Sequence, residues 1–120
     1  MVIMNKIPSP RQRPPWPEIV ELMYDRSLSF RDAEVIRVIY SADREKRLII
    51  TKSETGYYQY HLERLYAFDD EEWFYLSQRP DALPAMWDPF GRPGTSYFGT
   101  EQDLWNEITC LPEYKTYFAP

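Results

Sequence analysis

The side chains that most often carry catalysis are scarce in this chain of 120 residues. The sequence holds one histidine, His61, and one cysteine, Cys110. We therefore expect no Ser-His-Asp, Cys-His or multi-histidine metal site within a single chain. On the strand expected around it, His61 shares the polar face with Gln59 and Glu63, which is typical of an ordinary half-exposed histidine. This inventory favours a binding domain over an enzyme, and we assign no catalytic residue.

Short motifs for phosphate and metal binding are missing or incomplete. Neither G-x-x-x-x-G-K-[ST] nor G-x-G-x-x-G occurs in the sequence. Residues 91–94, Gly-Arg-Pro-Gly, look like a glycine-rich loop, but the proline removes an N–H donor that a phosphate cradle needs. The acidic residues 69–72 lack the D-x-D-x-D-G spacing of a calcium loop and are typical of a solvated turn. We expect neither a metal nor a cofactor.

Aromatic residues crowd the stretch from Tyr57 to Tyr75. Their large apolar area and few rotatable bonds suit either a core or a binding surface. We expect most of them to be core and cross-strand packing. One alternative is a row of exposed coplanar rings that reads sugars or single-stranded bases, which would need Arg37, Arg47 or Arg64 beside it.

Charge is unevenly distributed along the chain. The net charge is −5, although the first 15 residues contain three basic side chains and no acid. After Ala67, ten carboxylates face three basic side chains. Because an acidic surface repels phosphate backbones and attracts basic proteins, we expect a basic protein partner and disfavour nucleic acid.

Length and composition indicate one globular domain with no membrane association. At 120 residues and 43% hydrophobic content, the chain can fill a single core. The longest apolar runs, such as residues 48–50, are too short to cross a bilayer, and the N-terminus lacks the apolar stretch of a secretory signal. A lone cysteine allows no intrachain disulfide, which favours a cytoplasmic location. We expect Cys110 to be a small core residue.

The N-terminal part divides into an arm and the start of a domain. Residues 1–15 form a proline-rich arm, for which we expect an extended conformation with little packing. Residues 16–120 form the single domain. Its first helix is expected over residues 17–26, with Pro17 as the first helical residue.

The middle of the sequence predicts an antiparallel meander of four strands. Gly56 marks the clearest turn, because glycine tolerates the positive φ that closes a tight loop. A break in the alternation at Leu65 predicts a bulge or a strand end near Arg64. The four strands are expected at residues 34–41, 46–52, from 57 to about 64, and 73–76, with an acidic turn at 69–72 before the last.

The remainder predicts an ordered loop and two helices. Residues 78–99 combine proline, glycine and aromatic residues, which is typical of a loop held against the sheet. Thr100 is an expected N-cap with Asp103 as its capping partner, and Pro112 begins a second short helix. The expected class is α+β, with an N-terminal helix, a four-stranded antiparallel meander sheet, an ordered Pro/aromatic loop and C-terminal helices.

These features lead to a functional hypothesis. We expect a small cytosolic protein-interaction domain, of the immunity or inhibitor type, that docks a basic partner through an acidic, aromatic-rimmed surface. The alternative is a small-ligand binder or enzyme with a pocket between residues 78–99 and the sheet, using Tyr60, His61 and Glu63 as polar groups. The residues expected to bind the partner are Trp87, Phe90, Arg92 and Tyr97, with Asp69, Asp70, Glu71 and Glu72 as the steering patch.

Overall fold

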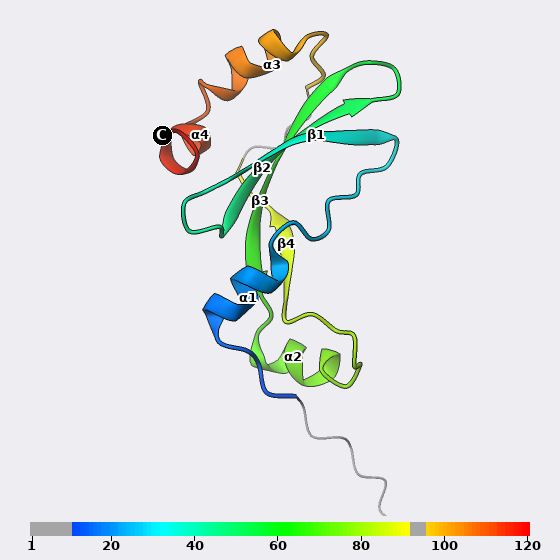
Figure 1. Ribbon diagram of the computed structural model, residues 1–120, viewed down its shortest axis with the longest axis vertical. Helices are drawn as coiled ribbons and strands as arrows, with labels where there is room; N and C mark the ends of the chain where they lie inside the picture. Colours follow the sequence, from blue (N-terminus) through cyan, green and yellow to red (C-terminus); the bar gives the residue numbers. More distant parts are fainter. Residues whose placement is uncertain (1–10, 92–95) are drawn as a thin grey trace, which may run out of the picture.

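The computed structural model describes residues 11–91 and 96–120, and it shows an α+β fold. Four strands form one antiparallel sheet in the order β1-β2-β3-β4, so each strand pairs with its neighbours in sequence (Figure 1). The class, the N-terminal helix and the C-terminal helices confirm the fold expected from the sequence. The elements are α1 (Trp16–Met23), β1 (Ala33–Tyr40), β2 (Lys46–Ser53), β3 (Tyr58–Ala67), α2 (Asp70–Leu76), β4 (Ala85–Pro89), α3 (Glu101–Ile108) and α4 (Pro112–Tyr117).

The fourth strand is formed by other residues than those expected. Residues 70–76 are helix α2, because Asp69 and Glu72 form a capping box. The Asp69 carboxylate accepts from the Glu72 backbone N–H at 2.8 Å, and the Glu72 carboxylate accepts from the Asp69 N–H at 3.1 Å. These bonds satisfy two N–H donors at the helix N-terminus. The acidic turn and the strand over 73–76 are therefore wrong, and residues 78–99 contain strand β4.

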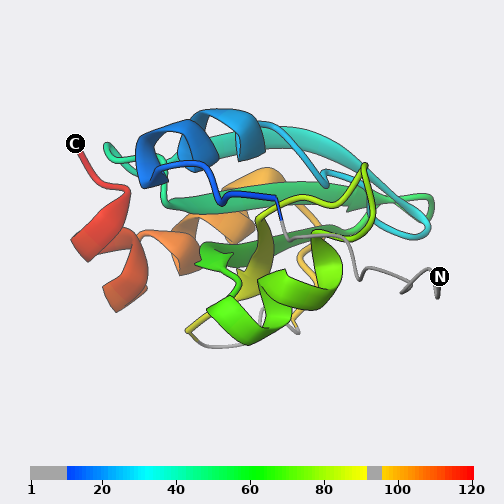
Figure 2. The same ribbon diagram turned by 90° about the horizontal axis from the view of Figure 1, so that it is seen from below.

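Helices cover both faces of the sheet. Figure 2 shows α1 on one side of the strands and α3 with α4 on the other. Because side chains alternate along a strand, each face has its own core. The core under α3 and α4 contains Leu48, Ile50, Tyr60, Leu62, Leu104, Ile108, Leu111 and Phe118. The core under α1 contains Ile19, Met23, Leu65, Ala85 and Trp87.

The two cores explain the break in alternation at Leu65. Strand β3 has no bulge there, since its register with β2 runs without a shift from Tyr58 to Arg64 and the strand continues to Ala67. Leu62 faces α3, whereas Leu65 faces α1. The expected bulge or strand end near Arg64 is therefore wrong. A register shift occurs instead in β1, between Val35 and Arg37.

The helix boundaries follow local signals closely. Helix α1 starts one residue before Pro17 and ends at Met23, three residues earlier than expected. It stops there because Asp25 and Ser27 adopt left-handed φ angles of 58° and 59°. The Thr100 hydroxyl accepts from the Asp103 N–H at 3.1 Å, as expected of the N-cap, and α4 begins at Pro112.

Two further findings concern Cys110 and the character of the helices. Cys110 is exposed, so its expected place in the core is wrong. Within the described ranges 11–91 and 96–120, none of the helices has the length and apolar character that spanning a membrane requires.

Candidate partner-binding site

The structure separates the residues that were expected to bind a partner. Trp87 is only 6% exposed on the α1 face, and Phe90 packs against the core on the α3 face. Tyr97 is 66% exposed beside Tyr57, at the turn end of the β2–β3 hairpin. Residues 69–72 begin helix α2 at the opposite end of the molecule (Figure 1). Arg92 lies outside the described residues.

The three polar groups of the alternative pocket do not share a face of the sheet. Tyr60 is buried in the core under α3, whereas its neighbour His61 and then Glu63 point to the α1 face. Glu63 pairs with Arg47 at 2.7 Å on that face. A pocket built from all three residues would need to reach both sides of the sheet.

His61 has the surroundings of a neutral structural histidine. Its Nε2 atom lies 3.0 Å from the Thr51 hydroxyl, and its ring stacks on Phe30 with centroids 4.3 Å apart. Burial lowers the pKa of the imidazole, because the charged form loses hydration. The imidazole therefore packs against Phe30 and contacts Thr51 on β2.

The arginines considered for a sugar or nucleic-acid surface are dispersed. Arg47 is buried on the α1 face. Arg37 lies over the ring of Trp105, 5.6 Å from its centroid, on the α3 face. Arg64 lies 3.8 Å from the Asp88 carboxylate. They do not flank one row of exposed rings on the sheet.

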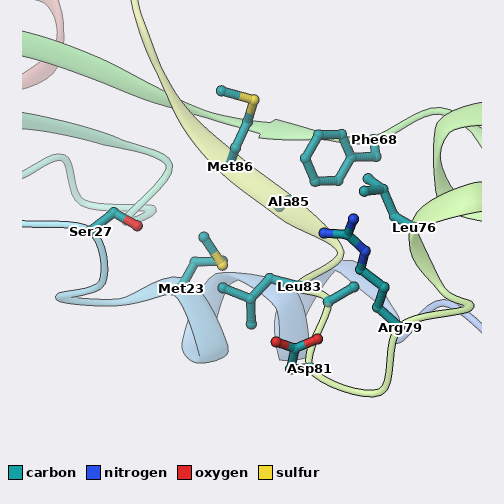
Figure 3. Close-up of a pocket in the computed structure, with 10 residues that line it drawn as sticks. Met23, Ser27, Phe68, Leu76, Arg79, Asp81, Leu83, Ala85 and Met86 are labelled. Carbon is teal, nitrogen blue, oxygen red and sulfur yellow. The ribbon is translucent and has the colours of Figure 1, made fainter.

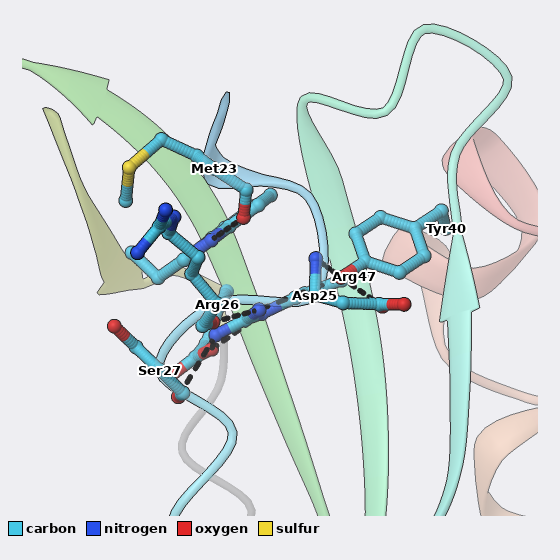
Figure 4. Close-up of polar contacts among 8 residues, drawn as sticks. Met23, Asp25, Arg26, Ser27, Tyr40 and Arg47 are labelled. Atoms are coloured by element: carbon cyan, nitrogen blue, oxygen red, sulfur yellow. Dashed lines mark hydrogen bonds and ion pairs between the residues drawn. The ribbon is translucent and has the colours of Figure 1, made fainter. Parts of the chain in front are cut away.

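Arg47 is the most deeply buried charged group in the described chain, and it is fully engaged (Figure 4). Its Nη1 donates to the Arg26 carbonyl at 2.6 Å, and its Nη2 donates to the Ser27 carbonyl at 3.1 Å. Its Nε donates to Glu63 at 2.8 Å, and its guanidinium lies 4.1 Å from the centroid of the Trp87 ring. The cluster ties the turn after α1 to strands β2, β3 and β4.

Two more contacts hold the same turn. The Trp87 indole donates to the Met23 carbonyl at 2.9 Å. The Tyr40 hydroxyl accepts from the Asp25 N–H at 2.8 Å and donates to the Asp25 carboxylate at 2.9 Å, while burial raises the pKa of this hydroxyl. Left-handed backbone at non-glycine residues costs about 1 kcal/mol or more each, and it persists where surrounding contacts fix it. The backbone at the end of α1 is therefore held in one conformation by these contacts.

A groove of about 360 Å³ lies against the end of α1, between α1, α2 and β4 (Figure 3). Its volume is typical of pockets that bind small molecules or single side chains. Two methionines, Met23 and Met86, line it from α1 and β4, and their flexible thioethers adapt to varied shapes. The other apolar lining residues are Phe68, Leu76, Ala82, Leu83 and Ala85, and the polar ones are Ser27, Arg79 and Asp81.

The segment that follows α2, and forms the outer wall of the groove, is held by Arg11. Its guanidinium lies over the Trp73 ring, 5.3 Å from the centroid, and the Trp73 indole donates to the Arg11 carbonyl at 2.6 Å. The little packing expected of the N-terminal arm is therefore wrong for residues 11–15, and residues 1–10 lie outside the described chain. The guanidinium also donates to three backbone carbonyls, those of Ser77, Arg79 and Ala82, at 3.2, 2.7 and 3.1 Å.

The acidity of the chain is concentrated in the same region. Residues 68–91 hold six carboxylates and one arginine, a net of −5, which equals the net charge of the whole chain. Asp69 and Glu72 cap α2, and Asp70 lies 2.6 Å from Arg13 with its carboxylate fully exposed. Glu71 and Asp81 are exposed at the surface.

Aromatic and apolar side chains are exposed on this acidic segment. On α2, Phe74 is 38% and Tyr75 64% exposed, and on the neighbouring strands Tyr66 is 37% and Met86 41% exposed. The Tyr66 hydroxyl donates to the Glu72 carboxylate at 2.8 Å, and this bond raises the pKa of the hydroxyl. We call residues 68–91, together with Met23 and Ser27, the α2–β4 surface.

Sequence reasoning missed the residues that make the groove. Met23 is far in sequence from Leu83 and Met86, and only the packing of α1 beside β4 brings them together. One signal was available, because Asp69 and Glu72 have the spacing of a capping box and so mark a helix start. A second was the short apolar run that ends at Trp87.

Comparison of the chain with protein-family models, curated proteins and solved structures finds no match. In the part of the chain that the structure describes, no three or more His, Cys, Asp or Glu side chains are grouped as metal ligands would be. Function therefore has to be argued from the geometry and charge of the α2–β4 surface.

Proposed function

We propose that this chain is a small cytosolic protein-interaction domain that docks a basic partner on the α2–β4 surface. One observation carries the proposal, namely that the segment holding a charge of −5 also lines the apolar groove. Apolar contacts at the centre of an interface supply affinity, and surrounding charges steer the encounter with a partner of opposite sign. The partner chemistry implied is a basic protein surface with an apolar side chain at its centre.

The composition of the surface supports the same conclusion. Phe74 and Tyr75 present aromatic area to solvent on the same helix as the exposed carboxylate of Glu71. Aromatic residues are enriched at the centres of protein interfaces because they bury much area with few rotatable bonds. Covering a basic face with an acidic one would block whatever polyanion that face binds, which is how an inhibitor- or immunity-type protein would act.

Blocking the groove tests this proposal. In an Ala82→Trp variant, a bulky side chain would occupy the space that Ala82 now lines. Tagged wild-type and variant proteins are compared by affinity capture from the native host at two salt concentrations, with mass spectrometry of the bound proteins. We expect a basic protein that the wild type captures, that salt releases and that the variant loses. Equal capture by the two baits, with unchanged thermal unfolding, would contradict the siting.

A second candidate is a small apolar ligand in the same groove. It is favoured by the groove volume of about 360 Å³, which lies within the range of ligand pockets. A ligand that binds only the folded chain raises its unfolding temperature. Thermal-shift screening of small apolar compounds should then give a hit for the wild type that disappears in Ala82→Trp, whereas identical hits in both proteins would exclude this groove.

A further inference from the structure

We propose that the turn end of the β2–β3 hairpin is a second binding site, and that it takes a neutral saccharide. The site is formed by Tyr57 and Tyr97 with the polar residues between β1 and the hairpin. It is separate from the α2–β4 surface, which lies at the other end of the molecule (Figure 1).

Two exposed tyrosine rings form the apolar part of the site. Tyr57 is 50% and Tyr97 66% exposed. Their centroids are 6.4 Å apart and their planes meet at 72°, and both rings line one hollow of about 540 Å³. Aromatic faces stack on flat apolar groups, as they do on nucleic-acid bases, and the C–H face of a sugar ring is such a group.

The backbone under both rings is fixed before any ligand arrives. In the hairpin, the Ser53 N–H donates to the Tyr57 carbonyl at 2.8 Å, and the Tyr57 N–H donates to the Ser53 hydroxyl at 3.0 Å. On the other side, Phe98 pairs with Tyr58 through two backbone bonds of 2.8 and 2.9 Å, which holds Tyr97 beside β3. A preformed site loses little conformational entropy on binding, so even a ligand that makes few contacts can bind it.

The polar lining points to an uncharged ligand. Arg31 and Asp32 supply one guanidinium and one carboxylate, 3.8 Å apart, which leaves no net charge. Thr55 and Gln59 add a hydroxyl and an amide, each of which can donate and accept. Sugar hydroxyls also donate and accept, and they match this set. A phosphate or a nucleic acid would need an excess of cations, which this lining lacks.

Titration with neutral oligosaccharides tests the proposal. The probes are hexamers of glucose in α- and β-linkage and of N-acetylglucosamine, followed by amide chemical shifts in ¹⁵N-labelled full-length protein. We expect shifts centred on residues 53–59 and 97 with at least one probe, at dissociation constants in the millimolar range. Tyr57→Ala and Tyr97→Ala should each weaken binding about tenfold, the equivalent of losing about 1.4 kcal/mol of stacking.

Tyr75→Ala is the matched control, because Tyr75 is equally exposed at 64% but lies on α2. It should leave saccharide binding unchanged. Three results would overturn the proposal: no shift with any of the probes, shifts that survive both hairpin substitutions, or a peptide from a captured partner that binds here when the saccharides do not. If Tyr97→Ala captures a basic partner at the wild-type level, partner binding at the α2–β4 surface does not depend on the hairpin site.

Discussion

Burying a guanidinium costs several kcal/mol unless its charge and its donors find partners, and Arg47 is 0% exposed. Its partners are the Glu63 carboxylate and the carbonyls of Arg26 and Ser27. Two of these partners belong to the turn after α1, so this one side chain joins the sheet to the wall of the groove. Arg47 therefore helps to position the groove through its contacts with this turn.

Replacing Arg47 should be among the most destabilising single changes in the described chain. Arg47→Met leaves the partly buried Glu63 carboxylate without its counter-charge and two carbonyls without donors, so we expect the free energy of unfolding to fall by about 3–5 kcal/mol. Urea unfolding measures it, with Arg37→Met as the control. Arg37 is exposed over Trp105, and its loss should cost about 1 kcal/mol or less. Similar losses for the two variants would refute the role given to the cluster.

His61 should make stability depend on pH in one direction. Because burial lowers the pKa of His61 in the folded chain, the unfolded chain binds a proton more readily once the pH falls below about 6.5. The contribution of His61 to stability is full above that pH and decreases as the pH drops toward the lower folded pKa. Thermal unfolding between about pH 7.5 and about pH 5 should show a steeper loss for wild type than for His61→Gln. Parallel pH profiles would count against it.

At the scale of elements, local signals located most of the fold. Alternation placed β1, β2 and β3, and the caps at Thr100 and Pro112 placed α3 and α4. Trp, Phe and Tyr favour strands, so residues 73–76 predict a strand, but the capping box at Asp69 overrides that weak preference. Trp87 lies in a segment for which the sequence predicts a loop, and it is buried because β4 turns it toward α1.

The candidate site was less accessible to sequence reasoning than the fold. The acidity of residues 68–91 is readable directly, and so is the exposure expected of its carboxylates. The groove is not, because Met23 and Met86 come to line one groove only through the packing of α1 beside the last strand. The separation of Tyr97 from the acidic residues likewise follows from the bridge between Phe98 and Tyr58, a pairing distant in sequence that no local pattern specifies.

The contacts of Arg11 yield a prediction at this scale. Its guanidinium donates to three carbonyls after α2 and stacks on Trp73. Arg11→Ala should therefore raise amide hydrogen exchange in residues 70–84 about tenfold, because local opening loses about 1.4 kcal/mol of charged hydrogen bonding. Exchange in β2 and β3 should not change, and Lys115→Ala is a control for removing a cation elsewhere. Unaltered exchange after α2 would show that Arg11 does not hold this wall.

At the scale of the whole molecule, the acidic α2–β4 surface and the tyrosine pair of the hairpin lie at opposite ends of the molecule (Figure 1). Residues 68–91 of the α2–β4 surface have a net charge of −5, which equals the net charge of the whole chain. The hollow at the tyrosine pair is lined by one arginine and one aspartate, so its lining has no net charge. Two copies of the chain would repel each other at the α2–β4 surface, whereas a basic protein would be drawn to it. This asymmetry is the main reason for proposing a basic partner of different sequence over self-association.

The most direct test of the central claim is to change the net charge by the same amount at two different places on the surface. Glu71→Lys with Asp81→Lys, and Glu101→Lys with Glu107→Lys, each raise the net charge from −5 to −1, and all four residues are exposed. Glu71 and Glu101 both lie in the first turn of a helix, so these two substitutions are matched in their effect on the helix dipole.

The measurement is the affinity of the captured basic partner, once purified, for the wild type and both double variants. We predict that the α2–β4 variant binds at least tenfold more weakly, which is about 1.4 kcal/mol, while the α3 variant stays within about twofold of the wild type. Equal weakening by the two variants would mean that only net charge matters. Binding unchanged in the α2–β4 variant would contradict the proposed surface.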